Sequence, residues 1–456
     1  MGSGADAFIE IVRRRRSAWH PTTSGRARRP VAGRYLRSLY FSTALATVLC
    51  AGAGPARAQS VTGSGNVYGA VGSTTTPLPT PPLTTWSIPT QDLNVGLTAT
   101  GTLTIEGGGS VSDNGAYVGN VSTGTVTVSG SGSTWHNSSV VNIGYGGVPA
   151  YTGTGTLTIE DGGYVYSGVP GSSNTDTAVS GIIGTFYAGV GTVTVSGTDA
   201  DGNASTWENA GQLMVGRYGK GTLNIEGGGT VSNADDGYIG VFADSTGTGN
   251  GTVTVSGTDG HGHASTWAGS ADLYVSVWGT GMLNIEAGGV VSNVDGVIGY
   301  GNTGTVTVSG TDGSGNPSAW NSSGDLYVSY YGDGTLTVED GGLVSNGDGL
   351  IGYDNTGTVT VTGTDGSGNA SAWNSSGDLY VGYYGDGTLT IANGARASAS
   401  GIDLAENAGS VGTINIGAAA GEAAVAAGTL DVPTVDFVDG TGTLVFNHTG
   451  ATTFAA

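Results

Sequence analysis

The chain has 456 residues, of which 88 are glycine and only 11% are charged, and its formal net charge is −22. This glycine share is more than twice the share of about 7% in ordinary domains, but 37% hydrophobic residues in regular patterns argue against a disordered chain. This acidic charge argues against nucleic acid and anionic membranes as partners, because both carry the same sign of charge and repel an acidic protein.

Residues 1–58 have the layout of a secretory signal peptide with a long basic start. They hold ten of the 13 basic residues, then the apolar run 39–51 and the small-residue ending at Ala58. The apolar run is too short to be a membrane span, and this order is typical of a cleaved leader. We expect cleavage between Ala58 and Gln59 and export through the inner membrane. The remaining chain has no cysteine, and its 3 basic and 33 acidic residues give a net charge of −30.

Residues 59–85 are rich in Gly, Ser, Thr and Pro, for example in 74–82. This composition is typical of a linker, so we expect a disordered linker or a loose cap here. The patterned region begins near Trp86 and covers residues 86–456.

The patterned region is a repeat, which sets the fold before any single residue is considered. The phrase GTLTIE or a close variant begins at successive spacings of 54, 66, 60, 53 and 53 residues, at Gly101, Gly155, Gly221, Gly281, Gly334 and Gly387. A second phrase, GTVTVSG or GTVTVTG, lies between these copies, and a tryptophan follows each time, at Trp135, Trp207, Trp267, Trp320 and Trp373. The two halves of each unit resemble one another, so the true period is a half-unit of alternately 23 and 30 residues in the 334–386 copy.

Each half-unit predicts about three short strands. In residues 358–362, Thr and Val alternate strictly, which places Val359 and Val361 on one face of a half-buried strand. Leu379 and Val381 alternate in the same way. One half-unit cannot bury these few side chains alone, but it can when stacked on a copy of itself. We therefore predict an all-β parallel β-helix of about thirteen coils, roughly 60 Å long at the spacing of neighbouring strands. A propeller of four-stranded blades is the alternative, although it gives no reason for two similar halves per blade.

The repeat phrase and the closing phrase GTINIGAAAGEA at 412–423 resemble the passenger region of bacterial autotransporters, the type V secretion proteins. The resemblance covers about residues 86–456 and implies a right-handed β-helix at the cell surface or outside a Gram-negative cell. In that family a C-terminal β-barrel anchors the protein in the outer membrane. We find no series of amphipathic strands with aromatic girdles up to Ala456, so we expect the barrel translocator to be a separate or missing part.

Two sets of aromatic residues are candidates for ligand contact. Trp320 and Trp373 belong to the repeated tryptophan column, which either fills a corner of the solenoid or binds a ligand. Tyr327 and Tyr380 point outward by the strand period of two, which predicts an exposed aromatic patch that is either merely solvated or adhesive.

Metal binding and catalysis have little support in the sequence. Four Asp-rich loops at 199–203, 259–263, 312–316 and 365–369 suit turns, but they lack the ligand pattern of known calcium loops. His261 and His263 form a pair without a third ligand for zinc. No His lies in a Ser/His/Asp or HExxH setting, so we expect no enzyme, no metal and no cofactor. The favoured function is a structural or adhesive surface protein with a host or neighbouring cell as partner; a polysaccharide-active enzyme and a passive spacer are the alternatives.

Overall fold

The computed structural model describes residues 59–71, 74–79, 83–146, 152–168, 179–244 and 247–450, all within one compact unit. The predicted leader, including Ala58, lies outside the described residues, and Gln59 is the first of them. No helix among these residues is long and apolar enough to cross a membrane.

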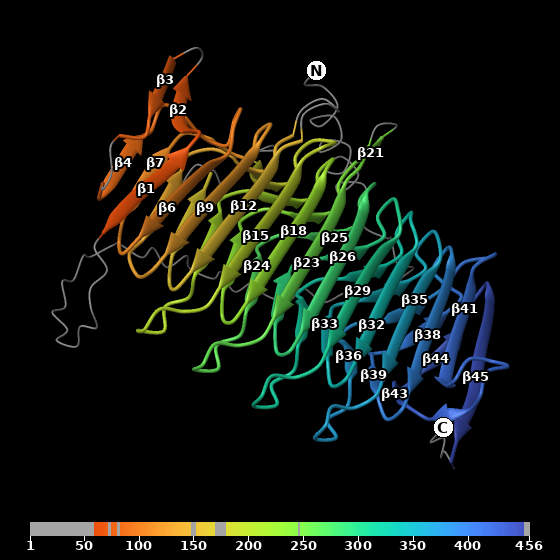
Figure 1. Ribbon diagram of the computed structural model, residues 1–456. Coiled ribbons are helices and arrows are strands. Elements are labelled where there is room, and N and C mark those ends of the chain that lie inside the picture. The colour runs from red at the N-terminus through yellow and green to blue at the C-terminus, as the bar shows by residue number, and fades with distance from the viewer. Residues whose placement is uncertain are drawn as a thin grey trace, which may run out of the picture. The chain divides into compact units, whose positions relative to one another are not determined.

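Three long sheets run the length of the unit, and the chain visits them in turn (Figure 1). The first sheet has the order β1 (Ser60–Gly65), β6 (Gly101–Glu106), β9 (Thr123–Ser129), β12 (Thr154–Glu160), β15 (Val190–Ser196), β18 (Lys220–Glu226), β23 (Asn250–Ser256), β26 (Thr280–Glu286), β29 (Gly304–Ser309), β32 (Gly334–Glu339), β35 (Gly357–Thr362), β38 (Asp386–Ala392), β41 (Val411–Gly417), β45 (Thr441–Thr449) and β42 (Val425–Ala426). The second sheet has the order β4 (Thr85–Ile88), β7 (Ser110–Asp113), β10 (Thr134–Asn137), β13 (Tyr164–Ser167), β16 (Thr206–Asn209), β19 (Thr230–Asn233), β24 (Thr266–Gly269), β27 (Val290–Asn293), β30 (Ala319–Ser322), β33 (Leu343–Asn346), β36 (Ala372–Ser375), β39 (Arg396–Ser398) and β43 (Thr429–Asp431).

The third sheet has the order β3 (Thr74–Pro77), β2 (Val67–Val71), β5 (Asp92–Val95), β8 (Ala116–Val118), β11 (Val141–Ile143), β14 (Val179–Ile183), β17 (Gln212–Val215), β20 (Gly237–Ile239), β25 (Leu273–Val275), β28 (Gly296–Ile298), β31 (Leu326–Val328), β34 (Gly349–Ile351), β37 (Leu379–Val381), β40 (Ile402–Leu404) and β44 (Val435–Phe437). A small hairpin, β21 (Ala243–Asp244) with β22 (Gly247–Thr248), stands apart. Each coil takes one strand from each sheet, as in β35, β36 and β37. Among the described residues each sheet has 13 such strands, so the predicted parallel β-helix of about thirteen coils is confirmed.

The core is made of columns of like side chains, one above another. Val359 lies in register between Leu336 and Leu389, and all three are fully buried. Val361 is buried as well, as the alternation of residues 358–362 predicts. A parallel ladder with every coil in the same register gives each inward side chain a similar neighbour above and below, and this is how a unit with few apolar residues buries them.

Glycine is required at two positions of the turn that joins the third sheet to the first. Gly352 has φ of 69°, a left-handed conformation that costs little only for glycine. Gly357 begins β35 so close to its neighbours that a Cβ atom would lie 2.3 Å from the backbone nitrogen of Gly352. The repeated Gly of the GTLTIE and GTVTVSG phrases therefore sets how tightly the coils can close.

The first coil is covered by ordered antiparallel strands, which favours a cap over a disordered linker, the two alternatives expected for residues 59–85. Residues 59–85 were expected to be a disordered linker or a loose cap, but β1 pairs antiparallel with β6, and β2 pairs antiparallel with β5 and β3. Val61 and Val67 are buried against the first coil. The described part of the segment is therefore a structured cap, and it covers strand edges that would otherwise be unpaired.

Candidate functional site

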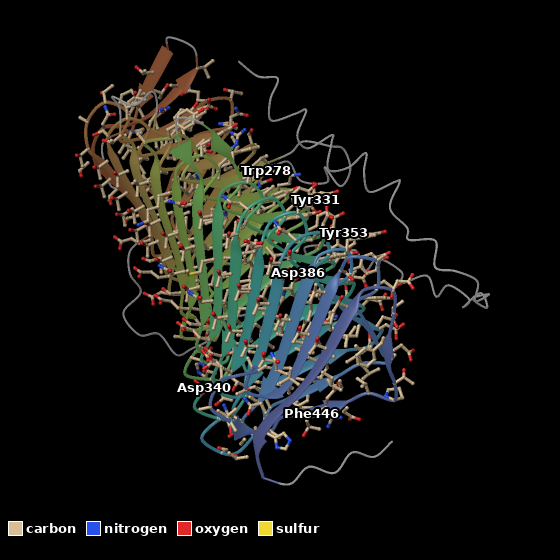
Figure 2. All side chains as sticks on the ribbon, turned by 90° about the vertical axis from the view of Figure 1, so that its right-hand side faces the viewer. Trp278, Tyr331, Asp340, Tyr353, Asp386 and Phe446 are labelled. Atoms are coloured by element: carbon tan, nitrogen blue, oxygen red, sulfur yellow. The ribbon has the colours of Figure 1, made fainter. Side chains whose placement is uncertain are left out.

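An aromatic stripe follows the turns from the third sheet to the first. It is defined by the aromatic residues that come two or three positions after the strands β11 to β37 of the third sheet, namely Tyr145, Phe186, Tyr218, Phe242, Trp278, Tyr300, Tyr330, Tyr331, Tyr353, Tyr383 and Tyr384. The left-handed residue that opens each turn, such as Gly352, directs the following side chains outward at the same place in each coil. Figure 2 shows Trp278, Tyr331 and Tyr353 following one another along one edge of the rod.

The rings of this stripe stack at nearly the spacing of the coils. Tyr330 lies between Tyr300 and Tyr353 with ring centroids 5.3 and 4.8 Å apart and planes 7° and 4° from parallel, and Tyr383 continues the stack 5.2 Å beyond Tyr353. Tyr384 lies edge-on to Tyr383 and is 52% exposed. Because the stacked rings cover one another's faces, the stripe offers mainly ring edges and hydroxyl groups to the solvent.

An acidic row lies beside the stripe, at the start of the strands of the third sheet. It consists of Asp236, Asp272, Asp295, Asp325, Asp348 and Asp378. In each case the Oδ1 atom accepts a hydrogen bond from the backbone N–H of the next member, at distances of 3.1, 3.2, 2.9, 2.9 and 3.0 Å. Burial, and to a lesser degree the charge of a neighbouring Asp348 carboxylate, raises the pKa of Asp325 and of Asp378 above the ordinary value. The row is thus fixed by the backbone, although its like charges repel one another.

Tyr327 and Tyr380 connect the stripe to the acidic row. Both are half-buried on the outer face of the third sheet, which agrees with the outward direction that the alternation predicts. The Tyr327 ring lies edge-on to Tyr330 at 5.5 Å, and the Tyr380 ring lies edge-on to Tyr383 at 5.4 Å. Burial and then the charge of Asp325 raise the pKa of Tyr327 well above its ordinary range, so its hydroxyl stays protonated. These two tyrosines are therefore part of one continuous surface and not isolated contacts.

Trp320 and Trp373 do not reach the surface, which settles the alternatives for the tryptophan column. Their side chains are 0% and 1% exposed, and they fill a corner of the solenoid. Each indole nitrogen donates a 2.6 Å hydrogen bond to an asparagine of the coil before it, Asn293 and Asn346 respectively. A buried indole N–H group needs such a hydrogen-bond partner, because water cannot reach it. The prediction that Trp320 and Trp373 contact a ligand is therefore wrong.

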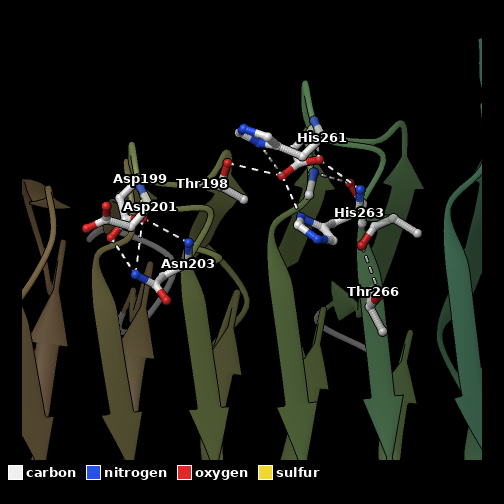
Figure 3. Close-up of polar contacts among 11 residues, drawn as sticks. Thr198, Asp199, Asp201, Asn203, His261, His263 and Thr266 are labelled. Atoms are coloured by element: carbon white, nitrogen blue, oxygen red, sulfur yellow. Dashed lines mark hydrogen bonds and ion pairs between the residues drawn. The ribbon is translucent and has the colours of Figure 1, made fainter.

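The four Asp-rich loops project on alternate coils where the first sheet leads to the second (Figure 1). In the third of them, Asp312 Oδ1 accepts from the backbone N–H groups of Ser314 and Asn316 at 2.8 Å. The side-chain amide of Asn316 also donates to Asp312 Oδ2, and these bonds lower the pKa of Asp312. Asp199 and Asn203 make the same contacts in the first loop (Figure 3). Turn chemistry accounts for the Asp and Asn of these two loops without a metal ion.

Sequence reasoning found single aromatic positions but missed the continuous stripe and the acidic row. The signal was present in the aromatic residue that follows most Gly or Ser turns and in the Asp that precedes the strands. What could not be seen was the ring stacking, since the stacked rings belong to different coils and are 23 to 32 residues apart in the sequence. The resulting surface is long and repetitive. It has hydroxyl donors, carboxylate acceptors and ring edges that repeat from coil to coil.

Two curated relatives resemble parts of this chain. The chain is 31% identical over 232 residues to the adhesin BmaC autotransporter of Brucella suis biovar 1 (strain 1330), an alignment that covers 47% of this chain and 6% of that protein. It is 36% identical over 129 residues to the uncharacterized lipoprotein YdeK of Escherichia coli (strain K12), covering 27% of this chain and 9% of that one. The chain thus spans less than a tenth of either relative's length. No protein-family model and no solved structure matches it. The resemblance to autotransporter passengers is confirmed, at a distance.

Proposed function

We propose that this chain is an exported, surface-displayed passenger of the autotransporter kind, and that it acts as a stiff adhesive rod. The observation that carries the proposal is the aromatic stripe beside the acidic row, because both repeat from coil to coil at the two ends of the strands of the third sheet. The distant similarity to an adhesin supports it, as does the leader-like start of the chain. The proposed partners are an outer-membrane barrel translocator and a ligand on a host or neighbouring cell.

Adhesion by this rod would rest on many weak contacts rather than on one deep pocket. Tyr331 and Tyr384 occupy equivalent positions two coils apart, and Trp278 occupies the same position two coils before Tyr331. A partner with repeating groups can contact several coils at once, and each further contact is then made at a high effective concentration. Residues 59–456 have a net charge of −30, which favours neutral or cationic partners over anionic ones.

The test removes the exposed aromatic edges without disturbing the coils. The equivalent turn position carries Asp354 and Asn407 in neighbouring coils, so Tyr331→Asn with Tyr384→Asn is compatible with the fold. Beads coated with the purified chain would be counted on epithelial-cell monolayers, and the double variant is expected to lower attachment at least fivefold.

A matched control lies on the first sheet. Thr307→Asn with Thr360→Asn changes two outward positions whose column already holds Asn284, so the fold is kept and attachment should not change. Equal attachment by the two double variants would reject the stripe as the adhesive surface. Attachment no better than that of bare beads for the unaltered chain would favour the spacer, and release of reducing sugars from a polysaccharide panel would favour the enzyme.

A further inference from the structure

The loop at residues 259–263 differs from its three counterparts in the two residues that face its aspartate. All four loops have the same backbone hydrogen bonds, in which the first Asp accepts from the N–H groups two and four residues later. In the other three, the last residue is an asparagine whose amide donates to Oδ2 of the Asp. Here the sequence is Asp-Gly-His-Gly-His, so histidines occupy the third and fifth positions.

Both histidines reach the same carboxylate oxygen. Asp259 Oδ2 lies 2.8 Å from His263 Nδ1 and 3.4 Å from His261 Nδ1 (Figure 3). The Asp259 side chain is only 2% exposed, whereas the two imidazoles are 61% and 62% exposed. The backbone N–H groups of both histidines hold Oδ1, and Thr198 Oγ1 from the neighbouring loop donates to Oδ2 at 3.2 Å. The loop therefore presents one fixed oxygen between two exposed imidazole rings.

We propose that Asp259, His261 and His263 form a surface site for a divalent transition-metal ion of the zinc type. Two imidazole nitrogens and one carboxylate oxygen are a donor set that Zn²⁺ takes, with water in the fourth position. Ligand atoms at 2.0–2.1 Å in a tetrahedron stand ~3.3 Å apart. The distance from Asp259 Oδ2 to His261 Nδ1 already has about this value, and the distance from Asp259 Oδ2 to His263 Nδ1 needs to increase by about half an ångström.

Closing the site requires the histidine rings to turn. Among the described residues no three acidic, His or Cys side chains are already arranged around an ion position. The exposure of both rings permits the rotation, and the carboxylate is held in place by the loop whether or not an ion is present. The sequence suggests only a lone histidine pair, because the aspartate looks like one more turn residue. The folded loop supplies it as the third ligand.

The chain contains its own control for this proposal. His261→Ser with His263→Asn gives the loop the sequence Asp-Gly-Ser-Gly-Asn, which two other loops of this chain already have at 312–316 and 365–369. This double variant is expected to fold with an unchanged thermal midpoint in the absence of metal. The full chain, without an affinity tag, would be titrated with Zn²⁺ by calorimetry. The unaltered chain should bind one ion, and the double variant should bind at least tenfold more weakly.

A converse experiment installs the site elsewhere. Ser314→His with Asn316→His gives the next loop the same five-residue sequence as residues 259–263, and it should raise the stoichiometry from one Zn²⁺ to two. Unchanged binding by the His261→Ser, His263→Asn variant would place the ion elsewhere, for example on the acidic row, and would overturn the proposal. An unaltered chain that binds no Zn²⁺ would overturn it as well.

Discussion

Ser329 stands where neighbouring coils have glycine, and it takes up an unfavourable conformation there. Its φ is 74°, close to the values of 70° and 69° at Gly299 and Gly352 in the adjacent coils. Its side chain is fully buried, and its hydroxyl has no hydrogen-bond partner within the part of the chain that the structure describes. A left-handed conformation costs roughly 1–2 kcal/mol for a residue with a Cβ atom, and a buried unpaired hydroxyl adds to that cost.

Ser329→Gly is therefore expected to stabilise the protein by about 1 kcal/mol, after the greater flexibility of glycine in the unfolded chain is allowed for. The measurement is the midpoint of thermal unfolding, which should rise by a few degrees. Ser276→Gly is the control, because Ser276 has φ of 68° but its hydroxyl donates to the carbonyl of Gly279 at 2.6 Å. Ser276→Gly should gain less stability than Ser329→Gly, since it loses this hydrogen bond. A Ser329→Gly protein that melts below the unaltered chain would contradict the argument.

Asp113 is a second residue that departs from the pattern of its column. Its carboxyl is fully buried, accepts a 2.6 Å hydrogen bond from the Trp135 indole and also accepts from the Asn137 amide. In later coils asparagines such as Asn293 and Asn346 accept from the tryptophan instead. Burial raises the pKa of Asp113 to about 8, so the folded protein keeps a proton that the unfolded chain loses near pH 4.

The contribution of Asp113 to stability should consequently fall as the pH rises from about 4 to about 8, because over this range its carboxyl holds a proton in the native state and not in the unfolded state. Asp113→Asn keeps an acceptor for the indole but removes the ionisation. It is expected to stabilise the protein by several kcal/mol at pH 8, on the order of 1.4 kcal/mol for each pH unit above the unfolded pKa, and by little at pH 4. Thermal unfolding of both proteins at the two pH values provides the check. A constant difference across this range would show that Asp113 does not titrate there.

At the scale of elements, the strands that belong to the repeat could be predicted from the sequence. Residues 358–362 were expected as a strand, and β35 is Gly357–Thr362. Alternation, β-branched residues and glycine turns are local signals that recur in every coil, so each copy supports the others. The cap strands β1 and β2 could not be predicted, because their Gly- and Ser-rich sequence does not differ from that of a linker. Pairing with β6 and β5 makes them strands, and that pairing is non-local.

The same division applies to the candidate site. The outward direction of Tyr327 and Tyr380 followed from the period of two, whereas the burial of Trp320 did not, since an aromatic repeat can face either way. The hydrogen bond from the Trp320 indole to Asn293 provides the reason for burial. An asparagine at the right register is recognisable only once the coils are aligned. The contacts between coils, including the aromatic stack and the acidic row, therefore cannot be predicted from the local sequence pattern.

At the scale of the whole molecule, the solenoid should tolerate the loss of a complete unit. Deleting Gly334–Asp386 removes the two coils built from β32 to β37 and joins Asp333 to Gly387. β38 would then pair with β29 in the register that β32 has now, since Gly304 pairs with Gly334 and Gly357 with Gly387. In the second sheet, Ala397 would lie on Trp320 as it now lies on Trp373. The new interface therefore repeats the contacts of the old one.

Because each coil contacts only its neighbours, the shortened chain is expected to fold with a thermal midpoint within a few degrees of the original. Its length should decrease by two strand spacings, about 10 Å, in small-angle X-ray scattering. The control deletes one residue more, Gly334–Gly387, so that Thr388 takes the place of the glycine. A Cβ at Gly387 would lie 2.2 Å from the backbone nitrogen of Gly382, and a slip by one residue would instead turn Leu389 and Ile391 outward. The control should lose cooperative unfolding. If both deletions fold equally well, then stacking in register does not hold the molecule together.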